Sequence, residues 1–287
     1  MKPIDLHVHS NKSDGSNTPE ELVLLAKEKN LSAFALTDHD TVDGIDEALA
    51  YVAQLRSSGC PNVPEVIPGI ELSTEYYGKD IHLIGLYIDH HSPVFHDHLK
   101  FFLESRVERN RKMCANLANA GIDISYDKLL EAFPDSVITR AHYSVYLVEH
   151  GYSLSKEDAF SQYLGDYTKY FVPRELITPE MGVELILQAG GIPVLAHPIL
   201  YHMSDARLEE LVSRLKKAGL VGIEAIYSTY NQAEERQVRK LAAKYDLCIS
   251  GGSDYHGIAK PGLEIGTGYG KLFIPEDLLN ALKQNNK

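Results

Sequence analysis

Apolar residues along this chain gather in short runs that are separated by polar segments and by helical patterns. Seven runs have the length and composition of strands: Ile4–Val8, Ala33–Thr37, Glu65–Ile70, Ile81–Ile88, Ile192–Ala196, Val221–Ile226 and Leu247–Gly251. Several are apolar at nearly every position, as expected for strands that are covered on both faces of a sheet. The pattern therefore predicts a largely buried sheet.

Helix signals separate many of these runs. Thr18-Pro19-Glu20-Glu21 is a capping box with proline at the first helical position, and it predicts a helix that ends near Lys29. Caps and apolar spacing predict three more helices, over residues 178–190, 208–218 and 232–245. Strands that alternate with helices favour a parallel α/β sheet, either open or closed.

The pattern changes between Asp89 and Ile177, where only helical segments are found. They are Phe101–Ala120, Tyr126–Ala132, Ala141–His150 and Lys156–Leu164. We therefore predict that residues 91–177 form a helical insertion, and that residues 1–90 and 178–287 together form the sheet-containing part.

The composition is that of an ordinary soluble globular protein, with 44% hydrophobic and 24% charged residues among 287. No apolar stretch approaches the ~20 residues that span a bilayer, and Asp5 stands where a signal peptide would continue its apolar region. We expect a cytoplasmic protein without membrane association. The three cysteines, Cys60, Cys114 and Cys248, form no Cys-x-x-Cys pair, so we expect free thiols.

The net charge of −12 opposes broad binding to long duplex nucleic acid, which normally needs a basic surface. It is compatible with a small anionic substrate if bound divalent cations reverse the local field. The sequence leaves the oligomeric state open.

Histidines and carboxylates follow the predicted strands with unusual regularity. In a strand, His7 and His9 point to the same face because residues two apart share a face. The candidate metal ligands are His7, His9, Asp14, His39, Glu71, His82, His197, Asp254 and His256. Nine nitrogen or oxygen donors are too many for one ion, and they suit two or three ions that share a bridging carboxylate. Only His82 is irregular, because it lies early in its strand.

These motifs resemble those of the PHP (polymerase and histidinol phosphatase) family. The matching segments are His7-x-His9, Thr37-Asp38-His39, Gly69-Ile70-Glu71, Ala196-His197-Pro198 and Ser253-Asp254-Tyr255-His256. The resemblance implies a distorted (β/α)7 barrel with three metal ions. In the implied arrangement His7, His9, Glu71 and Asp254 hold the first ion, Glu71, His82 and His197 the second, and Asp14, His39 and His256 the third.

Within that family, the chain is most similar to small phosphoesterases that act on nucleotides and on the 5′ ends of short RNA. The insertion carries the corresponding segments Thr139-Arg140-Ala141-His142, Tyr163-Leu164-Gly165 and Val172-Pro173-Arg174, with Ala141 in place of an expected proline. The resemblance implies that residues 91–177 are a substrate-binding cap on a metal-binding barrel.

These observations predict a phosphoesterase that requires three divalent ions, with Mn²⁺ expected first and Fe²⁺ or Zn²⁺ as alternatives. A metal-bridging hydroxide would attack the phosphorus. Arg140 and Arg174 would hold the phosphate, because guanidinium matches its oxygens. His202 or His142 would protonate the leaving oxygen. The expected substrates are 3′,5′-bisphosphorylated nucleotides or short oligoribonucleotides.

Other polar residues have simpler interpretations. Asp38 and Asp40 are either ligands or carboxylates that orient His39, and Glu224 is either a ligand or a buried hydrogen-bond partner. We expect surface or hydrogen-bonding roles for His90, His91, His96, His98 and His150, and a solvated helix face for Arg106, Arg109 and Arg111.

Three other functions remain possible from the sequence. Histidinol-phosphate phosphatase is the nearest alternative, although the insertion argues against it. A non-catalytic PHP module would normally have lost ligands, and all nine are present. A C–N amidohydrolase would normally carry a bridging lysine, which the sequence does not reveal.

Overall fold

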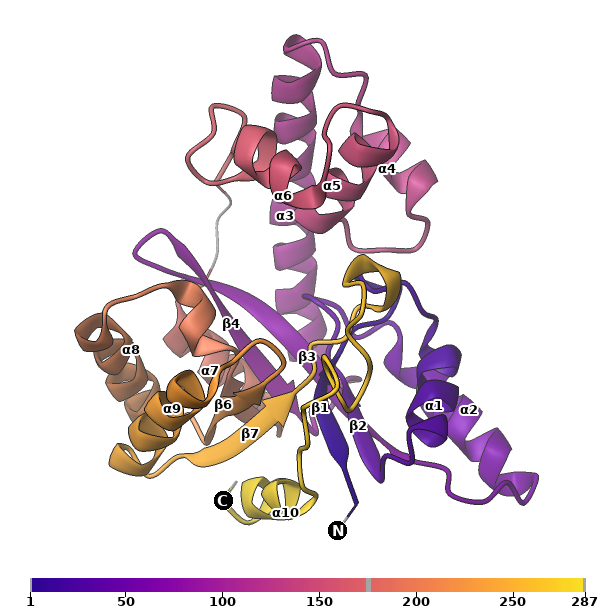
Figure 1. The fold of residues 1–287 in the computed structure, drawn as a ribbon, viewed down its shortest axis with the longest axis vertical. Helices are drawn as coiled ribbons and strands as arrows, with labels where there is room; N and C mark the ends of the chain where they lie inside the picture. The colour runs from indigo at the N-terminus through magenta and orange to yellow at the C-terminus, as the bar shows by residue number, and fades with distance from the viewer. Residues whose placement is uncertain (1, 174–176, 286–287) are drawn as a thin grey trace.

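Seven strands form one sheet, and the strands follow each other in the sheet in the same order as in the chain. They are β1 (Ile4–Val8), β2 (Ala33–Leu36), β3 (Glu65–Tyr76), β4 (Lys79–Leu86), β5 (Ile192–Leu195), β6 (Gly222–Tyr227) and β7 (Cys248–Gly252). The computed structural model describes residues 2–173 and 177–285. The strands curl into a nearly closed barrel with helices on its outside, so the predicted fold is confirmed (Figure 1).

The barrel closes between β1 and β7. Val8 bridges to Tyr255 in parallel, and the backbone N–H of His9 donates to the carbonyl of Tyr255 at 2.9 Å. Gly252 makes this approach possible, because a Cβ at that position would lie 2.1 Å from the Cβ of His7. Closure brings the two ends of the sequence together at one edge of the barrel.

We expected a parallel sheet, but the observed sheet is mixed. β4 pairs antiparallel with both β3 and β5, whereas the other neighbouring strands are parallel. β3 and β4 form a hairpin whose two-residue turn, Tyr77-Gly78, has positive φ at both positions (51° and 74°). β3 continues to Tyr76, beyond its predicted end at Ile70, because it pairs with β4 along that whole length.

Six helices accompany the barrel strands: α1 (Pro19–Glu28), α2 (Ile45–Ser57), α7 (Pro179–Gln188), α8 (Asp205–Ala218), α9 (Gln232–Lys244) and α10 (Asp277–Asn285). Four begin at a side-chain cap of the kind that made α1 and α7 predictable, whereas α9 was predicted from its apolar spacing. We did not predict α2. Its N-cap is Gly44, which offers no side-chain oxygen to the first turn.

Two apolar layers hold the barrel together. An outer layer lies between strands and helices and includes Phe34 of β2 and Val23 of α1. An inner layer fills the barrel and includes Ile4, Leu6 and Ala35. Because α10 contributes Leu279 and Leu282 to this inner layer, the end of the barrel away from the histidines is covered.

An irregularity in β1 decides where its histidines point. Three steps along β1, from Asp5 to Val8, match only two steps along β2. Ile4 and Leu6 belong to the inner layer, but Val8 belongs to the outer layer, so the extra residue reverses the alternation of faces. His7 and His9, which flank Val8, therefore face the interior at the mouth of the barrel.

Residues 93–164 form helices that project from the barrel (Figure 1). They are the long α3 (Pro93–Asn119), then α4 (Tyr126–Ala132), α5 (Arg140–Glu149), α6 (Lys156–Ala159) and the π-helical turn η1 (Phe160–Leu164). They share an apolar core of their own, with Met113, Leu129, Tyr143 and Leu147 at its centre. None of the helices that the structure describes is long and apolar enough to span a bilayer.

Candidate metal centre

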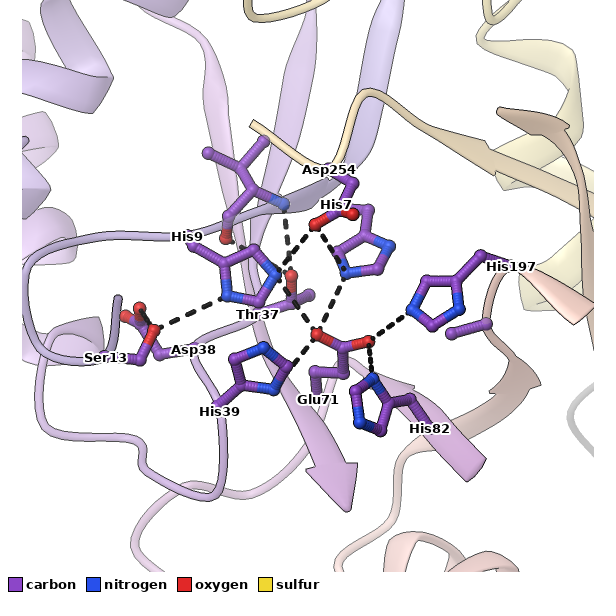
Figure 2. Close-up of polar contacts among 12 residues, drawn as sticks. His7, His9, Ser13, Thr37, Asp38, His39, Glu71, His82, His197 and Asp254 are labelled. Atoms are coloured by element: carbon purple, nitrogen blue, oxygen red, sulfur yellow. Dashed lines mark hydrogen bonds and ion pairs between the residues drawn. The ribbon is translucent and has the colours of Figure 1, made fainter. Parts of the chain in front are cut away.

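Five imidazoles surround the carboxylate of Glu71 at the mouth of the barrel (Figure 2). One of its oxygens, Oε2, lies 3.2 Å from a ring nitrogen of each of His7, His9 and His39. The other, Oε1, lies 2.9 Å from His82 Nδ1 and 3.0 Å from His197 Nε2. Glu71 is buried, and its carboxylate is shared by five imidazoles from four segments of the chain.

The surroundings of Glu71 keep it ionised. Burial alone raises the pKa of a carboxyl, because it removes water from the charged form. Here the electrostatic influence of the imidazoles of His39, His7 and His82 outweighs burial and holds the pKa of Glu71 well below its usual range. A carboxylate that stays anionic in a buried site is suited to bridge cations.

His82 reaches Glu71 because β4 runs against its neighbours. In a parallel strand, a histidine early in the run would lie at the far end of the barrel. In the antiparallel β4 the start of the strand lies at the mouth, where His82 pairs with Ser73 of β3. The irregularity noted in the sequence is thus explained by strand direction.

A second carboxylate, Asp254, lies just beyond β7 on the other side of the histidine pair. Its Oδ1 is 3.6 Å from His7 Nε2, 3.4 Å from His9 Nε2 and 3.3 Å from His256 Nδ1. Its Oδ2 accepts hydrogen bonds from Tyr227 and from Lys260, each at 2.5 Å. Burial by itself raises the pKa of Asp254. Lys260 and the imidazoles have a larger, opposite effect, so the pKa lies well below its usual range.

A third carboxylate, Asp14, follows β1 and faces His256 and His39. Its Oδ1 lies 3.1 Å from His256 Nε2, and its Oδ2 lies 3.8 Å from His39 Nε2. Thr139, from the start of α5, donates a hydrogen bond to Asp14 Oδ2 at 2.9 Å. The insertion therefore touches the cluster of donors directly.

All nine predicted ligands come together in one cluster, and their donor atoms fit bound cations. Four groups of donors from this cluster have ligand atoms within 4.8 Å of one another: His7, His9 and Glu71; His39, Glu71 and His82; His7, His197 and Asp254; and His9, Asp14, His39 and His256. His7 Nε2, His9 Nε2, His39 Nδ1 and Asp14 Oδ1 are buried without a hydrogen-bond partner. Buried polar atoms normally have partners, so atoms that converge in this way are suited to hold cations.

Further buried carboxylates position the donors. Glu224 of β6 accepts a hydrogen bond from the backbone of His197 at 2.8 Å and lies 3.2 Å from His7 Nδ1. Its interpretation as a hydrogen-bond partner is therefore supported. Asp38 accepts hydrogen bonds from the hydroxyls of Ser10 and Ser13, each at 2.6 Å, and so holds the loop after β1 rather than the ring of His39.

A cavity of about 260 Å³ opens beside the cluster, between the barrel and the insertion. Its lining includes the donors Asp14, His39 and His82, and three arginines, Arg106, Arg109 and Arg140, with Phe160 and Phe171. Cationic and aromatic side chains thus lie beside the predicted metal ligands. This combination is suited to a phosphorylated molecule that also carries a ring.

The expectation that Arg106 and Arg109 lie on a solvated helix face is wrong. Both are buried, and Arg106 forms an ion pair with Asp40 and a hydrogen bond to Ser73 Oγ at 3.3 Å. Asp40 also accepts a hydrogen bond from the backbone of Ser73, at 2.8 Å, so it orients β3 and Arg106. A signal was present in the sequence: the two arginines continue the apolar stripe of Phe95, Leu99, Phe102, Met113 and Leu117 along α3.

The three predicted catalytic residues have different surroundings. Arg140 lines the cavity, but its guanidinium is engaged by Asp166 and by Asp80, the latter at 2.9 Å. His202 follows the short helix η2 (Pro198–Tyr201), is exposed, and is not among the described residues that line the cavity. Arg174 lies outside the residues that the structure describes.

Sequence reasoning missed several residues that support the cluster. Lys260 and Tyr227 hold Asp254, Thr139 holds Asp14, and the hydroxyl of Tyr201 lies 3.1 Å from the backbone nitrogen of His82. Lys260 follows His256 by four residues, so it could have been considered as part of that motif. Nothing in the local sequence of Thr139 or Tyr201 indicated their contacts.

The fold and the site define a class of enzyme, the metal-dependent hydrolases built on an α/β barrel. Comparison with known proteins narrows this class. Residues 5–177 match the family model of the PHP domain, and the chain belongs to the PHP family. The family predicted from the motifs is thereby confirmed.

Two curated relatives cover most of the chain. A 5′-3′ exoribonuclease of Haemophilus influenzae is 35% identical over 89% of this chain and 90% of its own length. A 3′,5′-nucleoside bisphosphate phosphatase of Chromobacterium violaceum is 33% identical over 93% of this chain and 91% of its own length. Both names describe hydrolysis of phosphate esters, and the predicted enzyme class, a phosphoesterase, is confirmed.

Two solved structures have the same fold. One, from Chromobacterium violaceum, is described as an amidohydrolase with bound sulfate and no metal; it is 31% identical, with a TM-score of 0.87 over 99% of this chain and 96% of that one. The other, from Bifidobacterium adolescentis, was proposed to be a metal-dependent phosphoesterase; it is 25% identical, with a TM-score of 0.84 and the same coverage. A metal-dependent phosphoesterase is therefore the class to which this chain belongs.

Proposed function

We propose that this protein hydrolyses phosphate esters of nucleotides, with 3′,5′-bisphosphorylated nucleosides and the 5′ end of short RNA as its substrates. The observation that carries the proposal is the position of the arginine-lined cavity, which includes His39, His82 and Asp14 in its own wall. The names of the two curated relatives support both substrate types.

The nine clustered donors would hold three divalent ions, of which Mn²⁺ is the first choice and Fe²⁺ or Zn²⁺ the alternatives. His7, His9, Glu71 and Asp254 would hold one ion, Glu71, His82 and His197 a second, and Asp14, His39 and His256 a third. The short distances from both Glu71 oxygens to imidazole nitrogens support a bridging role for this residue. Ions bound here supply a Lewis acid and lower the pKa of water to about 7.

The remaining residues of the site act on the ligands and on the substrate. Tyr227 and Lys260 fix the orientation of Asp254, since both bond to the oxygen that faces away from the histidines. Glu224 fixes His7 in the same way from the opposite side. These contacts leave the donor atoms little freedom, which lowers the cost of ordering them when cations bind.

The cavity arginines would bind the phosphate oxygens. Arg106 is held in place by Asp40 and Ser73, so its guanidinium is positioned before the substrate arrives. Arg140 would contact the substrate by exchanging one of its carboxylate partners, Asp80 or Asp166, for a phosphate. We retain Arg174 as a further phosphate ligand on sequence grounds alone.

Residues 91–177 would form the substrate-binding cap on the barrel of residues 1–90 and 178–287. The separate apolar core of the insertion supports this division, as does the contact between Thr139 and Asp14. Phe160 and Phe171 of the insertion line the cavity and would lie against the nucleobase. A small single-stranded or mononucleotide substrate fits this site, whereas a long duplex is not expected there.

The proton donor to the leaving oxygen is assigned to a histidine near the mouth. His142 is buried beside the Asp14–Thr139 pair, and burial lowers its pKa to about 4, so it is neutral near pH 7. A neutral imidazole is a poor acid, so His202 remains the proposed donor. Because His202 is exposed, it would have to act with the substrate bound between the insertion and η2.

A phosphate-release assay tests the proposal. Chelator-treated protein is reloaded with Mn²⁺ and supplied with adenosine 3′,5′-bisphosphate or with a 5′-phosphorylated RNA pentamer. We expect inorganic phosphate from the first substrate and mononucleotides from the second. Absence of both products from protein that contains its metal ions would refute the proposal.

The same metal-loaded protein distinguishes the proposed function from the three alternative functions. If kcat/KM for histidinol phosphate exceeds that for both nucleotide substrates, the protein is a histidinol-phosphate phosphatase. If elemental analysis finds fewer than two ions per chain, a non-catalytic module is favoured. Hydrolysis of an N-acyl amide in place of the phosphate esters would favour an amidohydrolase. A cytoplasmic location stays a prediction that fractionation can test, and light scattering can measure the oligomeric state, which the sequence leaves open.

A further inference from the structure

A second group of metal-ligating side chains lies outside the catalytic cluster, at the foot of the long helix α3. Asp46 is in the first turn of α2, and His90 and His91 are in the segment between β4 and α3. Their ligand atoms lie within 4.8 Å of one another. The sequence predicts surface or hydrogen-bonding roles for His90 and His91, and the proposed function makes no use of this group.

The donors have the spacing of ligands around one ion. His90 Nε2 lies 3.0 Å from Asp46 Oδ1, and His91 Nε2 lies 3.3 Å from the same oxygen. Ligand atoms that surround a tetrahedral ion at about 2.0–2.1 Å are about 3.4 Å from each other. The two rings lie close together, with centroids 4.1 Å apart, and the same nitrogen of each faces the carboxylate.

Neighbouring contacts hold part of the group in place. His96, one turn along α3, bonds through Nε2 to the backbone oxygen of His90 at 2.7 Å. The side chain of His90 is only 13% exposed, whereas those of His91 and Asp46 are 66% and 69% exposed. One ligand is therefore fixed, and the other two can adjust around an incoming ion.

We propose that Asp46, His90 and His91 bind one divalent transition-metal ion, with Zn²⁺ as the best-suited type, at a site separate from the catalytic centre. Two imidazoles and a carboxylate are a preferred donor set for Zn²⁺, and water completes the coordination. The absence of a thiolate and the exposure of two ligands indicate a weaker site than a buried structural one.

Such an ion would tie the start of α3 to α2. The first turns of α3 pack on the barrel through Phe95, Leu99 and Phe102, and the same helix then carries Arg106 to the cavity. Arg106 lies 13 positions after Pro93, which corresponds to roughly 20 Å along a helix. At that distance the ion would stabilise the helix without taking part in catalysis.

The test compares zinc content among three full-length proteins: the wild type, the double variant His90→Ala/His91→Ala, and the control His98→Ala. His98 is an exposed histidine of α3 outside the group. Chelator-treated samples are dialysed against buffered Zn²⁺ and analysed for metal. We expect the double variant to bind one ion fewer per chain than the wild type, and His98→Ala to bind as many as the wild type.

Two further readouts make the result decisive. Co²⁺ should give a wild-type-minus-variant difference spectrum with the visible bands of a nitrogen- and oxygen-ligated ion, and all three proteins should keep the same Mn²⁺-supported activity. Equal zinc content and affinity in wild type and double variant would overturn the proposal, as would an equal loss in His98→Ala. The zinc count does not depend on turnover, so failure of the phosphoesterase assay would leave this test intact.

Discussion

The mouth of the barrel and the helical insertion both contain buried polar or charged side chains, but they differ in whether these side chains already have partners. At the mouth, His7, His9 and His39 have buried ring nitrogens with no hydrogen-bond partner. In the insertion, Arg106 and Arg140 are already paired with carboxylates. The buried nitrogens at the mouth are thus suited to take up cations, whereas these two arginines already have anionic partners.

This difference separates two tasks. The donors at the mouth come from strand ends, whose positions are set by backbone hydrogen bonds across the sheet, and a rigid frame suits metal coordination. The described arginines of the cavity come from α3 and α5, which pack through side chains, and Arg140 would exchange one acidic partner for a phosphate. The barrel would thus supply the chemistry, and the insertion would supply affinity for the substrate. Four substitutions test this division.

The largest effect is expected from Glu71→Gln. An amide at this position removes the negative charge that the surrounding imidazoles and cations share, so at least one ion should be lost. Removal of metal assistance worth several kcal/mol lowers kcat/KM by on the order of 10³-fold or more. Phosphate release and elemental analysis check the result. Unchanged turnover with unchanged metal content would contradict the role given to the barrel mouth.

Arg106→Met should have the next largest effect, on stability rather than on metal content. It removes the cationic partner of the buried Asp40 carboxylate, and breaking a buried ion pair in this way typically costs about 3–5 kcal/mol. Urea unfolding measures the change, with the exposed Lys112→Ala on the same helix as control. The double variant Asp40→Asn/Arg106→Met should recover part of the loss. If the double variant is less stable than Arg106→Met alone, the ion pair is not the cause.

Glu224→Gln should have an intermediate effect, on the affinity of the barrel mouth for metal ions. Glu224 contacts both His7 and the backbone of His197, so the amide would loosen two ligands without removing either. Residues that orient ligands in this way typically change metal affinity by about 10–100-fold. Titration with Mn²⁺ measures the affinity, and Glu235→Gln on α9 is the control. Equal affinities would show that His7 is held by the backbone alone.

Arg140→Ala is expected to have the smallest effect on the folded protein. Its partners Asp80 and Asp166 are exposed, and exposed ion pairs contribute at most about 1 kcal/mol. If Arg140 binds phosphate, KM should rise about tenfold with little change in kcat, since a charged hydrogen bond is worth about 1.5 kcal/mol or more. An unchanged KM would leave Arg140 as a structural link between α5 and the β3–β4 hairpin.

Much of this molecule was predictable because its signals are local. The His7-x-His9 pair shares a face through the two-residue period of a strand, and Thr18, Asn231 and Thr178 begin helices through their own side chains. The predicted ligands also follow strand ends, which meet at one edge of a barrel. The nine donors could therefore be grouped from the sequence before any distance was known.

Other features had no local signal. The direction of β4 depends on the hairpin at Tyr77-Gly78 and on pairing with β5, which is more than 100 residues away. α2 was missed because Gly44 gives no capping signal. The burial of Arg106 depends on Asp40, 66 residues earlier in the chain.

The sequence by itself determined which residues could bind metal and where most of the strands and helices lie, because spacing and side-chain chemistry act over a few residues. Only the tertiary structure decided which donors share a carboxylate, which arginines face the cavity, and that Asp46 meets His90 and His91. Those outcomes depend on contacts between segments far apart in the chain, and the free energy of such contacts comes from packing and desolvation that no short stretch of sequence contains.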